Sequence, residues 1–146
     1  MVRILGKLRL KSVLYVSRAS LPPEDTMLSV EALVGEARRR NQALHITGAL
    51  IFTGHHFAQL VEGPAEQVDR LMASIMQDSR HRSVRQFDEQ PADRRLFPEW
   101  SLAYSGPSTY VDRHVRELFA IHHDDLPRAR EELIELLTSL SLSPDG

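Results

Sequence analysis

The segment His45–Pro64 reads HITGALIFTGHHFAQLVEGP, and it is decisive for the fold. Residues 45–53 and 56–62 are rich in β-branched, aromatic and other apolar side chains, as strands usually are. Gly54 and His55 lie between the two runs, so the segment predicts a β-hairpin. Gly63 and Pro64 end the second strand, and a proline suits the first position of a helix.

A helix is predicted directly after this hairpin. Its apolar residues recur at i, i+3, i+4 and i+7, the clearest helical pattern in the chain, at Val68, Leu71, Met72 and Ile75. Upstream, residues 13–17 (VLYVS) predict a first strand. A helix capped by Asp25 or Thr26 is expected to follow it and to run to about Asn41.

Two more strands are predicted over residues 84–90 and 100–104. The order β-α-β-β-α-β-β indicates an α+β fold, a ferredoxin-like sandwich whose five-stranded mixed sheet carries two helices on one face. Amphipathic patterns predict two C-terminal helices, at 110–122 and 128–140. We therefore expect a first domain over residues 1–105. A helical extension over 106–146 would cap the sheet, build an oligomer or carry an output.

Bulk composition narrows the function. The chain has 146 residues, no cysteine and a net charge of −2. The charge gives no electrostatic reason to expect nucleic acid or an anionic membrane as a partner. No apolar run approaches the roughly 20 residues of a membrane span. The absence of cysteine fits a cytoplasmic protein, which is the expected location. The histidine pairs at 55–56 and 122–123 lack the spacing of known metal motifs, and no metal is expected.

Strand alternation places three polar side chains among apolar neighbours. Gln59 shares a strand face with Phe57 and Val61, Tyr15 with Val13 and Ser17, and Tyr104 with Trp100 and Leu102. If the helices cover these faces, the Gln59 amide and the Tyr15 hydroxyl are buried. Each would then need a partner, because an unpaired buried polar group costs about 1–3 kcal/mol. Alternation alone also allows the reverse orientation, in which Gln59 faces solvent.

Five blocks of sequence occur in an order that is typical of one family. They are LYVS at 14–17, NQALHITGAL at 41–50, FAQLVEG at 57–63, DSRH at 78–81 and RLFPEWSL at 95–102. Over about residues 14–102 the chain resembles the BLUF family, the sensors of blue light using FAD. It departs from the family at Leu102, where methionine is usual, and at Ala37, where some members have serine.

The resemblance implies a non-covalent flavin whose ring lies between the two helices, on the sheet. FAD is expected, and FMN or riboflavin could fill the same site. The residues that would hold it share polar or ring-packing chemistry. Asn41 would bind the C4 carbonyl and N3 edge and Arg80 the C2 carbonyl; His81 and Leu33 would pack on the ring, and Asp78 and Arg40 would lie near the ribityl chain.

The resemblance also implies a mechanism. Tyr15 would give an electron and a proton to the excited flavin, and Gln59 would then rotate or tautomerise. The output would pass through Trp100 or Leu102 to the C-terminal helices and, in trans, to an unidentified downstream protein. A photosensory module rather than an enzyme is expected, as a homo-oligomer.

Three other functions fit the sequence less well. A BLUF-like domain that has lost its flavin and photocycle would act only as a protein-interaction module. An acylphosphatase-type enzyme would need a glycine-rich phosphate loop, whereas residues 17–20 (SRAS) contain an arginine and no glycine. An RNA-binding sheet would need exposed aromatic side chains and a basic surface, which the pattern and the charge disfavour.

Overall fold

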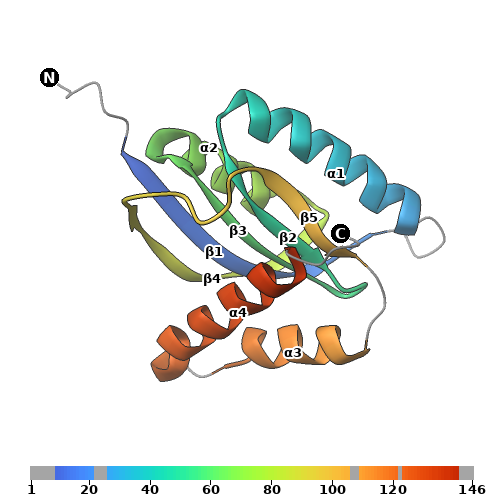
Figure 1. The fold of residues 1–146 in the computed structure, drawn as a ribbon. Coiled ribbons are helices and arrows are strands. Elements are labelled where there is room, and N and C mark those ends of the chain that lie inside the picture. Colours follow the sequence, from blue (N-terminus) through green and yellow to red (C-terminus); the bar gives the residue numbers. More distant parts are fainter. Residues whose placement is uncertain (1–8, 22–25, 106–108, 122, 142–146) are drawn as a thin grey trace, which may run out of the picture.

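The computed structural model describes residues 9–21, 26–105, 109–121 and 123–141. Five strands form a single sheet: β1 (Leu10–Ala19), β2 (Thr47–Phe52), β3 (His56–Pro64), β4 (His81–Ala92) and β5 (Trp100–Ser105). The helices are α1 (Thr26–Ala43), α2 (Ala65–Gln77), α3 (Thr109–Phe119) and α4 (Leu126–Ser141), with a short 3-10 turn, η2 (His123–Asp125), before α4. Figure 1 shows their arrangement.

The sheet has the strand order β4-β1-β3-β2-β5. Neighbouring strands are antiparallel except β2 and β5, which run parallel. The predicted α+β fold with a mixed five-stranded sheet is therefore confirmed. β3 lies at the centre and all nine of its residues are buried. Its register with β1 places Gln59 directly opposite Tyr15.

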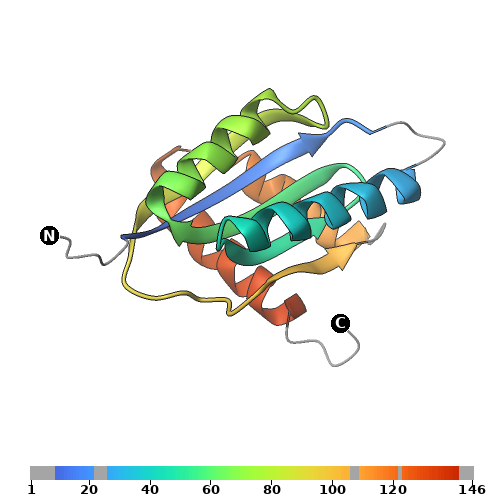
Figure 2. The same ribbon diagram turned by 90° about the horizontal axis from the view of Figure 1, so that it is seen from above.

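Helices cover both faces of this sheet. α1 and α2 lie on one face, and α3 and α4 lie on the other (Figures 1 and 2). Alternate side chains of β1 point to opposite faces of the sheet and so contribute to the cores on both sides. Val13 and Tyr15 pack with the apolar side chains of α2, whereas Leu14 and Val16 pack with those of α3 and α4. The division of the chain at residues 105 and 106 stays a prediction.

The boundaries differ from the predicted ones where the backbone departs from regular geometry. β2 begins at Thr47 rather than His45, because His45 has a φ of 59° and cannot continue a strand. β4 is longer than predicted because it pairs with β1 over nearly its whole length. α3 ends at Phe119, and the predicted end at His122 lies outside the described residues.

Gly48 fixes how closely β2 approaches β3. Its φ is +146°, and a Cβ atom there would lie 1.9 Å from the carbonyl oxygen of Leu60. Only glycine allows this contact. The same residue pairs with Trp100 of β5, so this close approach helps to set the position of β5 beside the centre of the sheet. None of the described helices is long and apolar enough to cross a bilayer.

Candidate functional site

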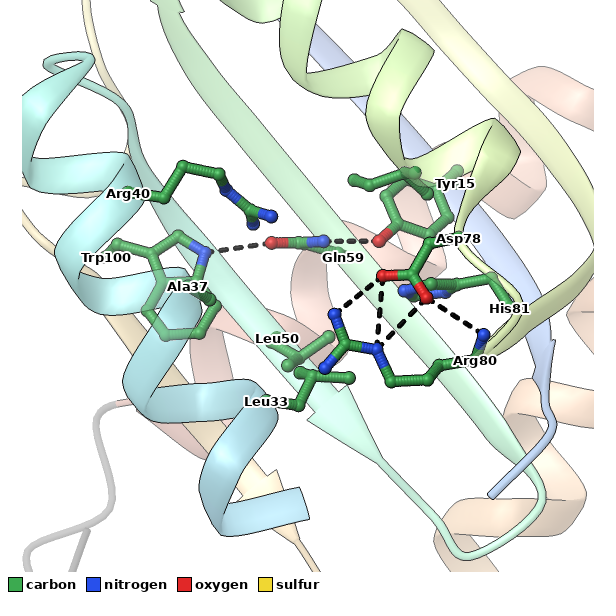
Figure 3. A pocket seen from close by; sticks show the side chains of 11 residues that line it. Tyr15, Leu33, Ala37, Arg40, Leu50, Gln59, Asp78, Arg80, His81 and Trp100 are labelled. Carbon is green, nitrogen blue, oxygen red and sulfur yellow. Dashed lines mark hydrogen bonds and ion pairs between the residues drawn. The ribbon is translucent and has the colours of Figure 1, made fainter. Parts of the chain in front are cut away.

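A chain of hydrogen bonds links three strands beneath α1 and α2. Gln59 of β3 is 4% exposed and lies between Tyr15 of β1 and Trp100 of β5 (Figure 3). Its Nε2 donates to the Tyr15 hydroxyl, and the Trp100 Nε1 donates to its Oε1 at 2.8 Å. Both ends of the amide are thus paired inside the protein. The buried orientation of Gln59 is the one that the structure adopts, and the solvent-facing alternative is excluded.

The connection between α2 and β4 contains an ion pair, Arg80–Asp78, which lies in the same site as the hydrogen-bond chain of Gln59. The Arg80 guanidinium donates to Asp78 from Nε at 3.0 Å and from Nη2 at 2.7 Å, and the Arg80 backbone N–H donates to Oδ1 at 2.9 Å. These bonds hold the pKa of Asp78 below its usual range, although burial opposes the shift. Arg80 Nη1 also lies 3.0 Å from Glu36 Oε2 on α1, so this residue bridges the two helical elements.

His81 closes one end of the site. Its ring lies 4.6 Å from the Phe57 ring and 6.0 Å from the Tyr15 ring, between centroids. Its Nδ1 shares a hydrogen bond of 2.8 Å with the Ser17 hydroxyl. Burial lowers the pKa of His81 to about 4, so the imidazole is neutral near pH 7.

These groups surround a small cavity between the sheet, α1 and α2. Its volume is about 20 Å³, room for about one water molecule. Its walls hold eight of the predicted site residues: Tyr15, Leu33, Arg40, Gln59, Asp78, Arg80, His81 and Trp100. Ala37, one of the two departures from the family pattern, also lines it. Leu50 and Ile75 also line it. Their apolar periodicity gives no signal that separates them from ordinary core residues.

Two predicted site residues lie just outside this wall. Leu102 packs on the apolar cluster beneath α1, on the same side of the sheet as Trp100. Asn41 is fully buried at the end of α1, and its Oδ1 accepts a hydrogen bond of 3.2 Å from Nε of Arg40. The Asn41 Nδ2 is buried and has no hydrogen-bond partner in the described part of the chain.

The residues present fit a flavin. An unpaired buried amide donor costs about 1–3 kcal/mol, and a ring carbonyl would satisfy it. Arg40 and Arg80 add charged donors on long, flexible side chains. A flavin ring is larger than this cavity, so binding would require side chains in its wall to move. The partly exposed Arg80–Glu36 ion pair that opposes such a movement is worth only about 1 kcal/mol or less, and the bonds from Arg80 to Asp78 oppose it as well. Among the described residues, no cluster of three or more His, Asp or Glu side chains could hold a metal ion.

Comparison with known proteins places this site in a family. The family model described as "BLUF: Sensors of blue-light using FAD" matches residues 10–103, which include every residue of the cavity. The "Blue light- and temperature-regulated antirepressor BluF" of Escherichia coli K12 is 38% identical over 81 residues. That match covers 54% of this chain but only 20% of the relative's length.

Solved structures agree. The dark-state structure of BlrB, a BLUF protein, superimposes with a TM-score of 0.65 at 29% identity, covering 88% of this chain and 97% of that one. Klebsiella pneumoniae BlrP1 with FMN and cyclic diGMP gives a TM-score of 0.59 at 29% identity, covering 86% of this chain and 29% of that one. By family model, sequence and fold, the chain belongs to the BLUF family of blue-light sensors.

Proposed function

We propose that this protein binds a flavin between α1 and α2 and acts as a blue-light photoreceptor rather than as an enzyme. The proposal is supported by the Tyr15–Gln59–Trp100 hydrogen-bond chain, together with the buried Asn41 amide donor, which has no partner among the described residues. Asn41 and Arg80 would bind the carbonyl edge of the ring, while Leu33 and His81 would pack against it. The family description names FAD and the BlrP1 structure contains FMN, which supports FAD as the flavin, with FMN as an alternative.

Tyr15 is suited to be the electron donor. A bound flavin supplies absorption of blue light and, once excited, a strong oxidant. Tyr15 is fully buried, and burial raises the pKa of its phenol, so it is a neutral donor at any ordinary pH. Because a buried phenol radical cation would be costly, its electron and its proton would leave together, with the bound flavin as the acceptor of both.

Gln59 converts this transfer into a change of hydrogen bonding. In the structure its Oε1 accepts from the Trp100 indole, and its Nε2 donates to Tyr15. A half-turn of the amide would set the NH₂ group against the indole N–H, and two donors cannot pair. The Trp100 bond would be lost, which changes the balance between two positions of β5 by roughly 0.5–1.5 kcal/mol.

β5 offers a path from this change to the other side of the sheet. Trp100 and Leu102 pack beneath α1, while Ala103 packs against the cluster formed with α3 and α4. We propose that a shift of β5 alters these helices and thereby the binding of a downstream protein in trans. We also propose that the chain forms a homo-oligomer.

The test is the visible absorption spectrum before and after blue light. We expect a yellow protein whose spectrum shifts reversibly to longer wavelength. Gln59→Leu should keep the colour and lose the shift. Gln86→Leu is the matched control, because Gln86 of β4 is also opposite Tyr15 but is exposed, and it should keep both.

Each contrary result overturns a different part. A colourless wild-type protein would exclude flavin binding. A yellow protein without any reversible shift would leave the flavin and remove the photocycle, as for an interaction module. A full shift in Gln59→Leu would exclude the amide as the switch.

A further inference from the structure

A buried carboxylate holds the segment that leads into Trp100. Residues 93–99 form neither helix nor strand. Glu62, three residues beyond Gln59 on β3, is 1% exposed. One of its carboxylate oxygens accepts the Leu96 N–H at 3.0 Å, and the other accepts the Phe97 N–H at 2.6 Å.

Arg95 fixes the same segment from the other side. Its Nη1 donates to the Thr47 hydroxyl at 2.9 Å and to the Glu62 carbonyl at 3.0 Å. Its Nη2 donates to the His45 carbonyl at 2.8 Å. His45 holds a left-handed backbone conformation, with a φ of 59°, in the turn that joins α1 to β2.

These bonds join the three parts of the light-sensing site. The turn closed by Arg95 begins at Asn41, whose carbonyl accepts the Ile46 N–H at 2.8 Å. Glu62 belongs to the strand of Gln59, and the segment 95–97 leads directly to Trp100. The Gly48 N–H adds a bond of 3.2 Å to the Glu99 carbonyl, immediately before Trp100.

The bonds from Glu62 and Arg95 are not needed merely to hold residues 93–99 against the sheet. The Phe97 side chain is 7% exposed and already packs into the apolar core beneath α4. A buried carboxylate is costly to desolvate, and burial raises the pKa of Glu62 despite the opposing N–H bonds and Arg95. What the ion and its directional bonds add to the apolar contact is a fixed orientation of the backbone just before Trp100.

We propose that Glu62 and Arg95 are positioning residues that hold the Trp100 indole N–H on Oε1 of Gln59. They thereby fix the orientation of the Gln59 amide before illumination and set the rate at which it returns afterwards. The photochemical part of this inference rests on the proposed function. The part that concerns the position of Trp100 does not rest on it, because it involves only contacts within the protein and no flavin.

The positioning part is tested on flavin-free protein. Trp100 is the only tryptophan, so intrinsic fluorescence reports its environment alone. Glu62→Gln leaves an amide NH₂ against one backbone N–H, and Arg95→Lys cannot reach three acceptors. Both variants should shift the emission to longer wavelength and raise acrylamide quenching about twofold or more. The exposed neighbours provide controls, Glu66→Gln and Arg94→Lys, which should match the wild type.

The photochemical part is tested on flavin-loaded protein. Loss of a charge-assisted hydrogen bond corresponds to about a tenfold change in an equilibrium or a rate. We therefore expect Glu62→Gln to change the dark-recovery rate by about tenfold and to move the dark-state spectrum, a change that loss of stability alone would not produce. Circular dichroism verifies that each variant is folded, and Arg95→Lys decides the matter if Glu62→Gln is not.

The failures are distinguishable. Trp100 emission and recovery rates equal to those of the two controls would overturn the inference while leaving the photoreceptor intact. A wild-type protein without a photocycle would overturn the proposed function, and the fluorescence experiment would still decide whether Glu62 and Arg95 position Trp100.

Discussion

The coupling between Tyr15 and Gln59 can be measured without light or flavin. Tyr15→Phe removes the hydroxyl that accepts from Gln59 Nε2, and both side chains are buried, at 0% and 4% exposure. A stranded donor in such a place should lower the free energy of unfolding by about 1–3 kcal/mol. Gln59→Leu strands two groups, the Tyr15 hydroxyl and the Trp100 indole N–H, and should lower the free energy of unfolding by about 2–6 kcal/mol.

The double variant separates a hydrogen bond from general packing. With both substitutions present, the stranded groups of the Tyr15–Gln59 pair are gone together. The loss should then be smaller than the sum of the two single losses by about 1–3 kcal/mol. The assay is urea unfolding of flavin-free protein followed by circular dichroism, because a bound ligand would add its own stabilisation.

This comparison of two single variants and a double variant needs a control at an exposed tyrosine and a stated threshold for additivity. Tyr110 is 71% exposed, so Tyr110→Phe should change the free energy of unfolding by no more than about 0.5 kcal/mol. If the two single losses add in the double variant to within about 0.5 kcal/mol, the residues are not coupled and the hydrogen-bond chain is the wrong description.

Three further predictions concern the surroundings of this pair. The pKa of His81 is about 4 in the folded protein, against roughly 6.5 in the unfolded chain. Because the unfolded chain binds more protons between these values, the free energy of unfolding should fall by up to about 3 kcal/mol as the pH drops from 6.5 to 4. Urea unfolding at pH 7 and pH 5 measures this fall, and His81→Gln should reduce it. Gly48→Ala would place a Cβ 1.9 Å from the Leu60 carbonyl and should lower the free energy of unfolding by more than about 3 kcal/mol in thermal denaturation, a loss under 1 kcal/mol being contrary to the structure. Glu36→Gln removes the exposed ion pair to Arg80 and should change the free energy of unfolding by less than about 1 kcal/mol. Riboflavin should then associate faster with the protein in stopped-flow fluorescence. An unchanged association rate would show that this ion pair does not restrict entry of the flavin into the site.

The order of helices and strands could be predicted from the sequence because alternation and helical periodicity are local. Alternation also placed Gln59 and Tyr15 on matching faces, but it could not decide which face is buried. That choice depends on where α1 and α2 pack, which involves residues far away in the chain. The family resemblance indicated eight of the residues that line the cavity, while Leu50, Ile75 and the bonds among the lining residues required the structure.

Glu62 shows what local reasoning misses. A glutamate within a strand is ordinarily expected to face water. It is buried here because residues 93–99 fold back over the end of β3 and bring two backbone N–H groups to it. The buried Asn41 amide donor is hidden in the same way, because only the packed structure shows that none of its described neighbours accepts from it.

The strand order gives the site a fixed side and a movable side. β3 is paired along both edges and buried along its whole length, so Gln59 is mounted on the stiffest part of the sheet. β5 is an outer strand that pairs only with β2, so it can shift with the loss of one set of interstrand bonds. The Gln59–Trp100 bond therefore joins the fully paired centre of the sheet to an outer strand, and a strain applied to this bond would displace the outer strand more readily than the centre.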